Sequence, residues 1–305
     1  MLIKLSGAGL IAIEWTLIGI AFMLGLARLD LRFHHHQSGF FLRDIFYFSA
    51  LTVGLVNTSL DTALWTSGIE LYEETNDTWA GPEDVMVRAL KVVFVSYLTF
   101  YLQLYLTKAT LLTLYFEIFG QRSRKTLISL YALTGFCISG FIITIFLLLF
   151  GDPFGSTWSM DASQRDEDRQ FKKDVVAWAF HFVTDLGIFI LPIVCISRLQ
   201  MSRAQKISAG LTFGLGFINI SITIIRWFIV HSPVSPPSTY AVDQALFMTD
   251  AHTCLIISIL PSLRLYLRIF RAEKTTSRAK GTESRSHARK EPSTYQETSH
   301  PHTNG

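Results

Sequence analysis

Several ionisable side chains in this sequence lie inside apolar stretches that are each long enough to cross a membrane. A charged group in the hydrocarbon region of a bilayer costs a few kcal/mol or more, so it normally faces the protein interior and finds a partner. A carboxyl group buried there can also keep a proton and act as a general acid. The residues concerned are Glu14, Asp61, Lys108, Asp185, Arg226 and Asp250.

Lys108 and Asp185 are the first candidates for a pair. From the predicted span boundaries and a rise of about 1.5 Å per residue, Lys108 lies in the inner third of one span and Asp185 near the middle of another. If the two spans are neighbours, the lysine stem can bring the charges together, which removes much of the cost of two isolated buried charges. We predict an intramembrane ion pair, which either clamps the helix bundle or takes part in function, and we favour the clamp.

Asp61, Arg226 and Asp250 fall at a similar depth, nearer the opposite surface, and Glu14 lies close to the middle of its span. Together they are candidates for a binding site that opens to the outside, with packing clamps as the alternative interpretation. Aromatic residues at nearby depths either complete an apolar pocket or pack between helices. These aromatic residues are Tyr97, Phe100, Tyr101, Tyr105 and Trp227.

The element that must position Lys108 is the run 97–119, YLTFYLQLYLTKATLLTLYFEIF, which is almost continuously apolar and has Glu117 near its end. The whole chain of 305 residues has the same character, since 50% of it is hydrophobic and 17% is charged. Soluble domains carry about 25% charged residues, so the surplus apolar surface must face lipid. With a mean hydropathy of +0.34, the composition predicts an integral membrane protein.

We predict an all-α membrane protein, a bundle of seven transmembrane helices, because helices satisfy their own backbone groups in lipid and the alternation of a membrane barrel is absent. The bundle occupies residues 1–271. A basic, Ser- and Thr-rich tail, 272–305, is expected to be disordered because it has almost no apolar residues. The predicted spans are 5–27, 45–66, 92–116, 127–149, 175–196, 207–230 and 245–265.

Most of the 27 Lys and Arg residues fall in the tail and in one set of loops, which includes Arg28 and Arg43. The positive-inside rule therefore places the amino terminus outside and the carboxyl terminus in the cytoplasm. The opposite loops, 67–90 and 151–174, are acidic. The first of these carries the sequon Asn76-Asp77-Thr78, so we predict glycosylation at Asn76.

Cysteine and histidine spacing indicates neither a disulfide nor a metal site. Cys137, Cys195 and Cys254 all fall inside apolar runs, and the tract His34-His35-His36 has no acidic or cysteine partner nearby, so a solvated turn is the favoured interpretation. The sequence contains no diagnostic catalytic motif, which leaves enzymatic activity uncertain and on balance not expected.

Three runs resemble the fungal rhodopsin-domain family, a family of seven-helix membrane proteins similar to a pathogenicity-related receptor class and to a membrane protein of the satratoxin biosynthesis cluster. They are the run 97–119, the run WAFHFVTDLGIFILP at 178–192 and the run KISAGLTFGLGFINISITIIR at 206–226. The resemblance covers about residues 10 to 270. The matching positions are Lys91, Tyr101, Lys108, Tyr115, Trp178, Asp185, Pro192, Lys206, Gly214, Arg226 and Pro261.

The resemblance implies a seven-helix fold and residence in a membrane, but no particular ligand. The chain departs from the family at His181, where an asparagine is frequent, and at Arg43-Asp44, where paired aspartates are frequent. Retinal is not expected and no other cofactor is implied, since the predicted seventh span has no lysine for a Schiff base. Residues Phe116-Glu117-Ile118 also lack the arginine-centred triplet of ordinary G-protein-coupled receptors.

Three functions remain open. The first is a receptor-like protein that senses a small extracellular or lipophilic molecule, and the second is a membrane-embedded accessory protein or enzyme, such as a cyclase or isomerase, in a fungal secondary-metabolite cluster. A transporter is the minor alternative. The expected partners are membrane lipid and such a ligand, with no nucleic acid; the tail is either inert or contacts a cytoplasmic signalling partner. The expected location is the plasma membrane or an endomembrane.

Overall fold

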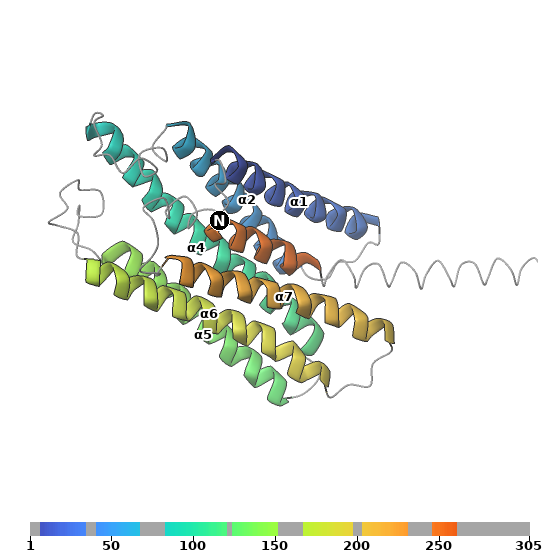
Figure 1. Ribbon diagram of the computed structural model, residues 1–305. Coiled ribbons are helices and arrows are strands. Elements are labelled where there is room, and N and C mark those ends of the chain that lie inside the picture. Colours follow the sequence, from blue (N-terminus) through green and yellow to red (C-terminus); the bar gives the residue numbers. More distant parts are fainter. Residues whose placement is uncertain are drawn as a thin grey trace, which may run out of the picture. The chain divides into compact units, whose positions relative to one another are not determined.

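The computed structural model describes residues 7–34, 41–67, 83–120, 124–151, 167–197, 203–230 and 246–260, and every one of these ranges is helical over most of its length. Contacts divide the chain into two units, Met1–Ser262 and Leu263–Gly305, and the second lies outside the described residues. The labelled helices of the first unit (Figure 1) are α1 (Gly7–His34), α2 (Phe41–Thr66), α4 (Glu83–Phe119), α5 (Arg124–Phe150), α6 (Glu167–Ser197) and α7 (Arg203–Val230). A further short helix spans Leu246–Leu260.

Four of these helices are long and apolar enough to cross a membrane: Ala8–Asp30, Asp84–Phe119, Arg124–Phe150 and Phe171–Val194. Gly216–Ile229 and Leu246–Leu260 are shorter apolar helices. Helix α2, predicted as a span from its hydropathy, is outside this set. It buries several polar side chains, among them Asn57 and Asp61. The all-helical prediction is therefore supported over the described residues, while the count of seven spans and the orientation of the termini stay predictions.

Helix α4 is the central element, since it packs against α2, α5 and α6 (Figure 1). No glycine or proline interrupts its 37 residues. Threonines inside it donate hydrogen bonds to the helix backbone, as Thr107 does to the Gln103 carbonyl at 2.8 Å. The helix ends at Phe119, and the N–H of the following Gly120 donates to the Phe116 carbonyl at 3.0 Å. A Cβ at this glycine would lie 2.4 Å from the same oxygen, so the close approach favours glycine.

The Leu246–Leu260 helix is the second hub of the unit. Leu255 and Ile259 join an apolar cluster with α1 and α2, while Phe247 and Met248 join another with α4 and α6. A short helix that is buried on several sides must satisfy its polar groups inside the protein. Asp250, His252 and Ser258 are all fully buried. This helix therefore carries polar groups that need partners on the surrounding helices.

Two helices begin well before the spans that the sequence predicts. Helix α4 starts at Glu83 rather than at 92, and α6 at Glu167 rather than at 175, so residues predicted as parts of loops 67–90 and 151–174 are helical. Hydropathy marks only the apolar part of a helix, which explains the difference. In the polar first turns of α4, Arg88 and Asp84 form an exposed i,i+4 ion pair that supports the helix.

Several predictions concern residues outside the described ranges. They include the sequon at Asn76, the tail 272–305, His35 and His36, and the side chain of Cys195. His34 is the last residue of α1. Cys137 and Cys254 are buried free thiols. Among the described residues, no group of three or more His, Cys, Asp or Glu side chains is arranged to hold a metal ion.

Candidate functional site

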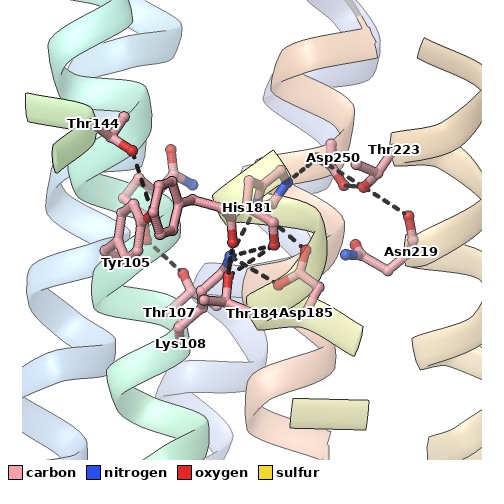
Figure 2. A network of polar contacts seen from close by, with 12 residues as sticks. Tyr105, Thr107, Lys108, Thr144, His181, Thr184, Asp185, Asn219, Thr223 and Asp250 are labelled. Atoms are coloured by element: carbon pink, nitrogen blue, oxygen red, sulfur yellow. Dashed lines mark hydrogen bonds and ion pairs between the residues drawn. The ribbon is translucent and has the colours of Figure 1, made fainter. Parts of the chain in front are cut away.

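Lys108 lies at the centre of a buried polar cluster between α4 and α6 (Figure 2). Its side chain is only 1% exposed. The Nζ atom lies 2.6 Å from Thr184 Oγ1, 2.8 Å from His181 Nδ1, and 3.0 Å from both the His181 carbonyl and Asp185 Oδ1. An ammonium group has three N–H donors, so Lys108 has more acceptors within reach than it can use at one time.

Helix α6 supplies these acceptors because His181, Thr184 and Asp185 follow the i, i+3, i+4 spacing that places side chains on one helix face. The Thr184 hydroxyl donates back to the Phe180 carbonyl at 2.7 Å or the His181 carbonyl at 2.8 Å. Its oxygen is therefore left to accept from Lys108. The predicted neighbours Lys108 and Asp185 thus lie in direct contact, with their helices packed together.

The cluster continues from His181 to Asp250 on the Leu246–Leu260 helix. His181 Nε2 lies 3.0 Å from Asp250 Oδ2, and the Thr223 hydroxyl of α7 lies 3.2 Å from Asp250 Oδ1. Asp250 is fully buried. We refer to Tyr105, Lys108, Thr144, His181, Thr184, Asp185, Thr223 and Asp250 as the Lys108 cluster, which ties together α4, α5, α6, α7 and the Leu246–Leu260 helix.

The hydrogen bonds of the cluster assign the tautomer of His181. The Lys108 ammonium can only donate, so Nδ1 of a neutral imidazole accepts from it, and the ring proton is on Nε2. That proton is donated to Asp250 Oδ2. Asp185 Oδ2 lies 3.3 Å from His181 Nδ1, but two acceptors facing one another make no hydrogen bond. Asp185 Oδ2 accordingly has no hydrogen-bond donor.

Tyr105 and Gly140 close the cluster on the α5 side. The ring centroid of Tyr105 lies 5.1 Å from Lys108 Nζ, a cation–π distance, and its hydroxyl lies 3.5 Å from Thr144 Oγ1. A Cβ added at Gly140 would lie 3.0 Å from the Tyr105 hydroxyl and 3.2 Å from the Phe180 ring. Glycine at 140 therefore lets α5 approach the tyrosine closely.

A second buried network joins α2, α4 and the Leu246–Leu260 helix. His252 Nε2 lies 2.9 Å from Thr58 Oγ1, and the Gln103 amide donates to His252 Nδ1 at 3.1 Å. Nearby, the Asn57 amide donates to Met248 Sδ at 3.2 Å. The partners of His252 are all uncharged, so this histidine is held as a neutral hydrogen-bonding group.

Three of the remaining predicted site residues, Glu14, Asp61 and Arg226, are not members of the Lys108 cluster. The carboxylate of Asp61 is buried on α2 and accepts from Ser96 Oγ at 3.4 Å, and Glu14 is buried on α1. The guanidinium carbon of Arg226 lies 4.5 Å from the ring centroid of Phe247. The hydrogen bonds of Asp250 go to His181 and Thr223. Asp250 therefore belongs to the Lys108 cluster, whereas the sequence grouped it with Asp61 and Arg226.

Phe247 is the centre of an aromatic group that the sequence indicated only in part. Tyr97, Phe100 and Tyr101 of α4 all contact its ring. Trp227, predicted with them, instead stacks on Trp178 with ring centroids 4.6 Å apart. We call Tyr97, Phe100, Tyr101 and Phe247 the Phe247 group. Within this group, Phe247 precedes Asp250 by about one turn of the Leu246–Leu260 helix.

Two ion pairs with buried arginines lie where α1 ends and α2 begins. Arg28 of α1 pairs with Asp44 of α2, and Arg43 Nη1 of α2 lies 2.6 Å from Glu117 Oε2 near the end of α4. Both arginines were predicted in a loop of the cytoplasmic set, yet their side chains are at most 2% exposed. The sequence counted both as loop charges, whereas here they are paired across helices.

Several residues of the site escaped the sequence analysis. His181 was noted only as a departure from the family pattern, and Thr184, Thr223 and Phe247 were not singled out. The signal available for His181 was its position four residues before Asp185, on the same helix face. Thr223 and Phe247 carry no such signal, because an isolated threonine or phenylalanine in an apolar run is ordinary.

Apolar helices of membrane-spanning length, with buried charges paired between them, are typical of a multi-pass α-helical membrane protein. A family model described as the fungal rhodopsin domain matches residues 27–269, and the chain belongs to that family. It is 28% identical over 193 residues to a SAT4 family membrane protein of Emericella nidulans, a match that covers 61% of this chain. The chain spans about half, 49%, of the length of that relative. No solved structure matches it.

Proposed function

We propose that this membrane protein is receptor-like and senses a small extracellular or lipophilic molecule through the Phe247 group. The observation that carries the proposal is the layout of the Leu246–Leu260 helix. Phe247 contacts α4 rings on one turn, and Asp250 contacts His181 and Thr223 on the next. A molecule that displaces the Phe247 ring would therefore move the acceptor of the buried His181 proton.

The chemistry around Phe247 suggests what such a molecule contains. The rings of the Phe247 group offer apolar and aromatic contact, and the Arg226 guanidinium stacked on Phe247 offers a cation to an acidic or carbonyl oxygen. Asp61 and Glu14 are further binding candidates. We therefore expect a largely apolar ligand with at least one polar oxygen.

A ligand shifts a conformational equilibrium only through its different affinity for the two states, so binding must be tested together with response. The full chain in detergent is screened by thermal stability against a panel of lipophilic carboxylic acids, alcohols and terpenoids. Hits should stabilise wild type but not Phe247→Ala or Arg226→Ala. Phe217→Ala is the matched control, since Phe217 is 64% exposed on α7 and should leave binding unchanged.

Cells that express the chain are then assayed for a transcriptional response to each hit. Alanine variants at Asp61, Arg226 and Asp250 are compared with wild type after confirming that each variant folds. If all three respond like wild type, the receptor proposal is wrong.

A second candidate is a membrane-embedded accessory protein or enzyme for a lipophilic metabolite. The observation in its favour is the oxygen Asp185 Oδ2, which is buried without a hydrogen-bond donor and is suited to take a proton from a substrate. Against it, both ring nitrogens of His181 already have protein partners. Product analysis of a host that expresses the chain with candidate substrates tests this alternative, and unchanged chemistry would exclude it for those substrates.

The orientation of the chain in the membrane is part of the receptor proposal. With the amino terminus outside and the tail in the cytoplasm, a ligand would approach from the lumen or exterior, in the plasma membrane or an endomembrane. The basic tail would then lie beside anionic lipid, where each Lys or Arg contributes about 1 kcal/mol of attraction. A cytoplasmic signalling partner would bind through that tail.

A further inference from the structure

Asp250 is a fully buried carboxylate whose charge is not matched by a cation. Its contacts are His181 Nε2, 3.0 Å from Oδ2, and the Thr223 hydroxyl, 3.2 Å from Oδ1. Both are neutral donors, because Lys108 donates to Nδ1 of the imidazole and the ring proton is on Nε2. Among the described residues, no lysine or arginine forms an ion pair with Asp250. Buried charges in proteins are paired or bind a metal ion, so this carboxylate favours a bound cation.

Lys108 does not supply that cation. Its Nζ atom lies 3.0 Å from Asp185 Oδ1, so these two charges compensate each other. Lys108 contacts Nδ1 of His181 and Asp250 contacts Nε2, so the imidazole ring stands between the ammonium group and Asp250. A cation bound at Asp250 Oδ1, the oxygen that faces α7, is therefore separated from the ammonium group by this ring.

Helix α7 presents oxygen atoms to the same side of Asp250. Asn219 and Thr223 are four residues apart, so they lie on one face of α7. Asn219 is only 5% exposed, and its side-chain oxygen Oδ1 is buried without a hydrogen-bond donor. Figure 2 shows this side chain pointing from α7 toward Asp185 and Asp250. Two acceptors that face each other make no hydrogen bond, whereas a cation between them satisfies both.

Thr223 can turn from a hydrogen-bond donor into a ligand. Its single hydroxyl proton has two acceptors at 3.2 Å, Asp250 Oδ1 and the Asn219 backbone carbonyl. When the proton is donated to the carbonyl, a lone pair of Oγ1 faces the carboxylate. We propose that Asp250 Oδ1, Thr223 Oγ1 and Asn219 Oδ1 form a binding site for an alkali-metal cation such as sodium. Asp250 Oδ2 keeps its hydrogen bond from His181.

The ligands determine the class of ion. All three are oxygen atoms, which suit hard cations rather than zinc or copper. The site has one carboxylate, so a monovalent ion leaves it neutral, whereas a divalent ion would leave an uncompensated positive charge in the interior. It also differs from a site of three or more His, Cys, Asp or Glu ligands, of which the described part of the chain holds none.

Thermal unfolding of the full chain in dodecyl maltoside, followed by tryptophan fluorescence, tests the site. Sodium chloride is titrated against choline chloride at constant ionic strength, with calcium chloride as a parallel series. An ion that binds only the folded protein stabilises it by mass action. We expect sodium to raise the unfolding midpoint by about 3–6 °C at ten times its dissociation constant. Calcium should leave the midpoint at its value in choline.

Variants at the ligands locate the effect. Asp250→Asn removes the charge that the cation compensates but keeps a polar side chain, so it should fold and show no sodium shift. Asn219→Leu and Thr223→Val each remove one ligand and should need at least about tenfold more sodium for the same shift. Ser221→Ala is the matched control for Thr223→Val, because it also removes an α7 hydroxyl that is hydrogen-bonded within its own helix. It should respond to sodium like wild type.

The proposal is overturned if wild type has the same midpoint in sodium and in choline, or if calcium stabilises it more than sodium does. It is also overturned if Asp250→Asn keeps the sodium shift, or if Ser221→Ala loses it. The first two outcomes need wild type alone, so they decide the matter even where a variant does not fold. Sodium binding requires no organic ligand, so these outcomes are separate from the failure of the receptor proposal.

Discussion

Replacing Lys108 with methionine tests whether the cluster holds the bundle together. The change keeps most of the side-chain volume but removes the only cation of the cluster and its hydrogen bonds to Thr184 and Asp185. Breaking a buried ion pair by removing one partner costs about 3–5 kcal/mol, because the remaining charge stays buried without compensation. Since whole domains are stable by about 5–15 kcal/mol, this loss would be a large fraction of the total.

Thermal unfolding in mild detergent, followed with a thiol-reactive dye, measures this loss. Cys137 and Cys254 are buried free thiols and should react only as the bundle opens. Lys91→Met is the control, because Lys91 is an exposed lysine of the same helix. It should unfold like wild type, while Lys108→Met unfolds at a clearly lower temperature.

A double variant distinguishes the effect of an unpaired buried charge from the effect of the changed side-chain shape. Lys108→Met combined with Asp185→Leu removes both members of the pair, and replacing a buried pair by apolar residues is often nearly neutral. The double variant should therefore regain most of the stability lost by Lys108→Met. If Lys108→Met is as stable as wild type, or the double variant is no better than the single one, the Lys108–Asp185 pair is not what stabilises this contact.

Three further predictions concern other parts of the chain. Arg43→Ala leaves the partly buried Glu117 carboxylate without its partner and should lower the stability by about 1–3 kcal/mol, whereas the exposed Arg88→Ala should change it by less than about 1 kcal/mol in the same unfolding assay. Gly140→Ala should destabilise by crowding Tyr105, while Gly135→Ala, which meets nothing within 4 Å, should stabilise its helix by about 0.5–1 kcal/mol. Treatment with an N-glycosidase should increase the gel mobility of wild type expressed in yeast but not of Asn76→Gln, and an unchanged wild type would contradict the predicted orientation of that loop.

The contact between Lys108 and Asp185 could be predicted from the sequence, because the depth of each residue in the membrane already restricts its possible partners. Each residue is the exceptional charge in an otherwise apolar run, and a long lysine stem tolerates errors of a few residues in the boundaries. The partner of Asp250 could not be predicted from depth in the same way. Depth placed Asp250 with Asp61 and Arg226, but only the packing of the short Leu246–Leu260 helix decides which neighbour each face meets.

The helix boundaries and the buried arginines show a second limit of prediction from sequence. Hydropathy found the apolar part of α4 but not its first turns from Glu83, because a helix continues past the membrane surface without an apolar signal. Arg43 was counted as a loop charge since it precedes the predicted span that begins at residue 45. Its pairing with Glu117, which lies 74 positions away in the chain, depends on α2 packing against α4.

The position of Asp250 in the last described helix bears on how the protein is assembled. During synthesis α4 and α6 are made first, so Lys108 can meet Asp185 before the Leu246–Leu260 segment has left the ribosome. Until that segment arrives, His181 Nε2 has no carboxylate to receive its proton, and the hydroxyl of Thr223 can donate only to the Asn219 carbonyl of its own helix. The late helix therefore completes the interior of the bundle, and a chain stalled before it would expose unsatisfied polar groups to the quality-control machinery of the membrane in which it is made.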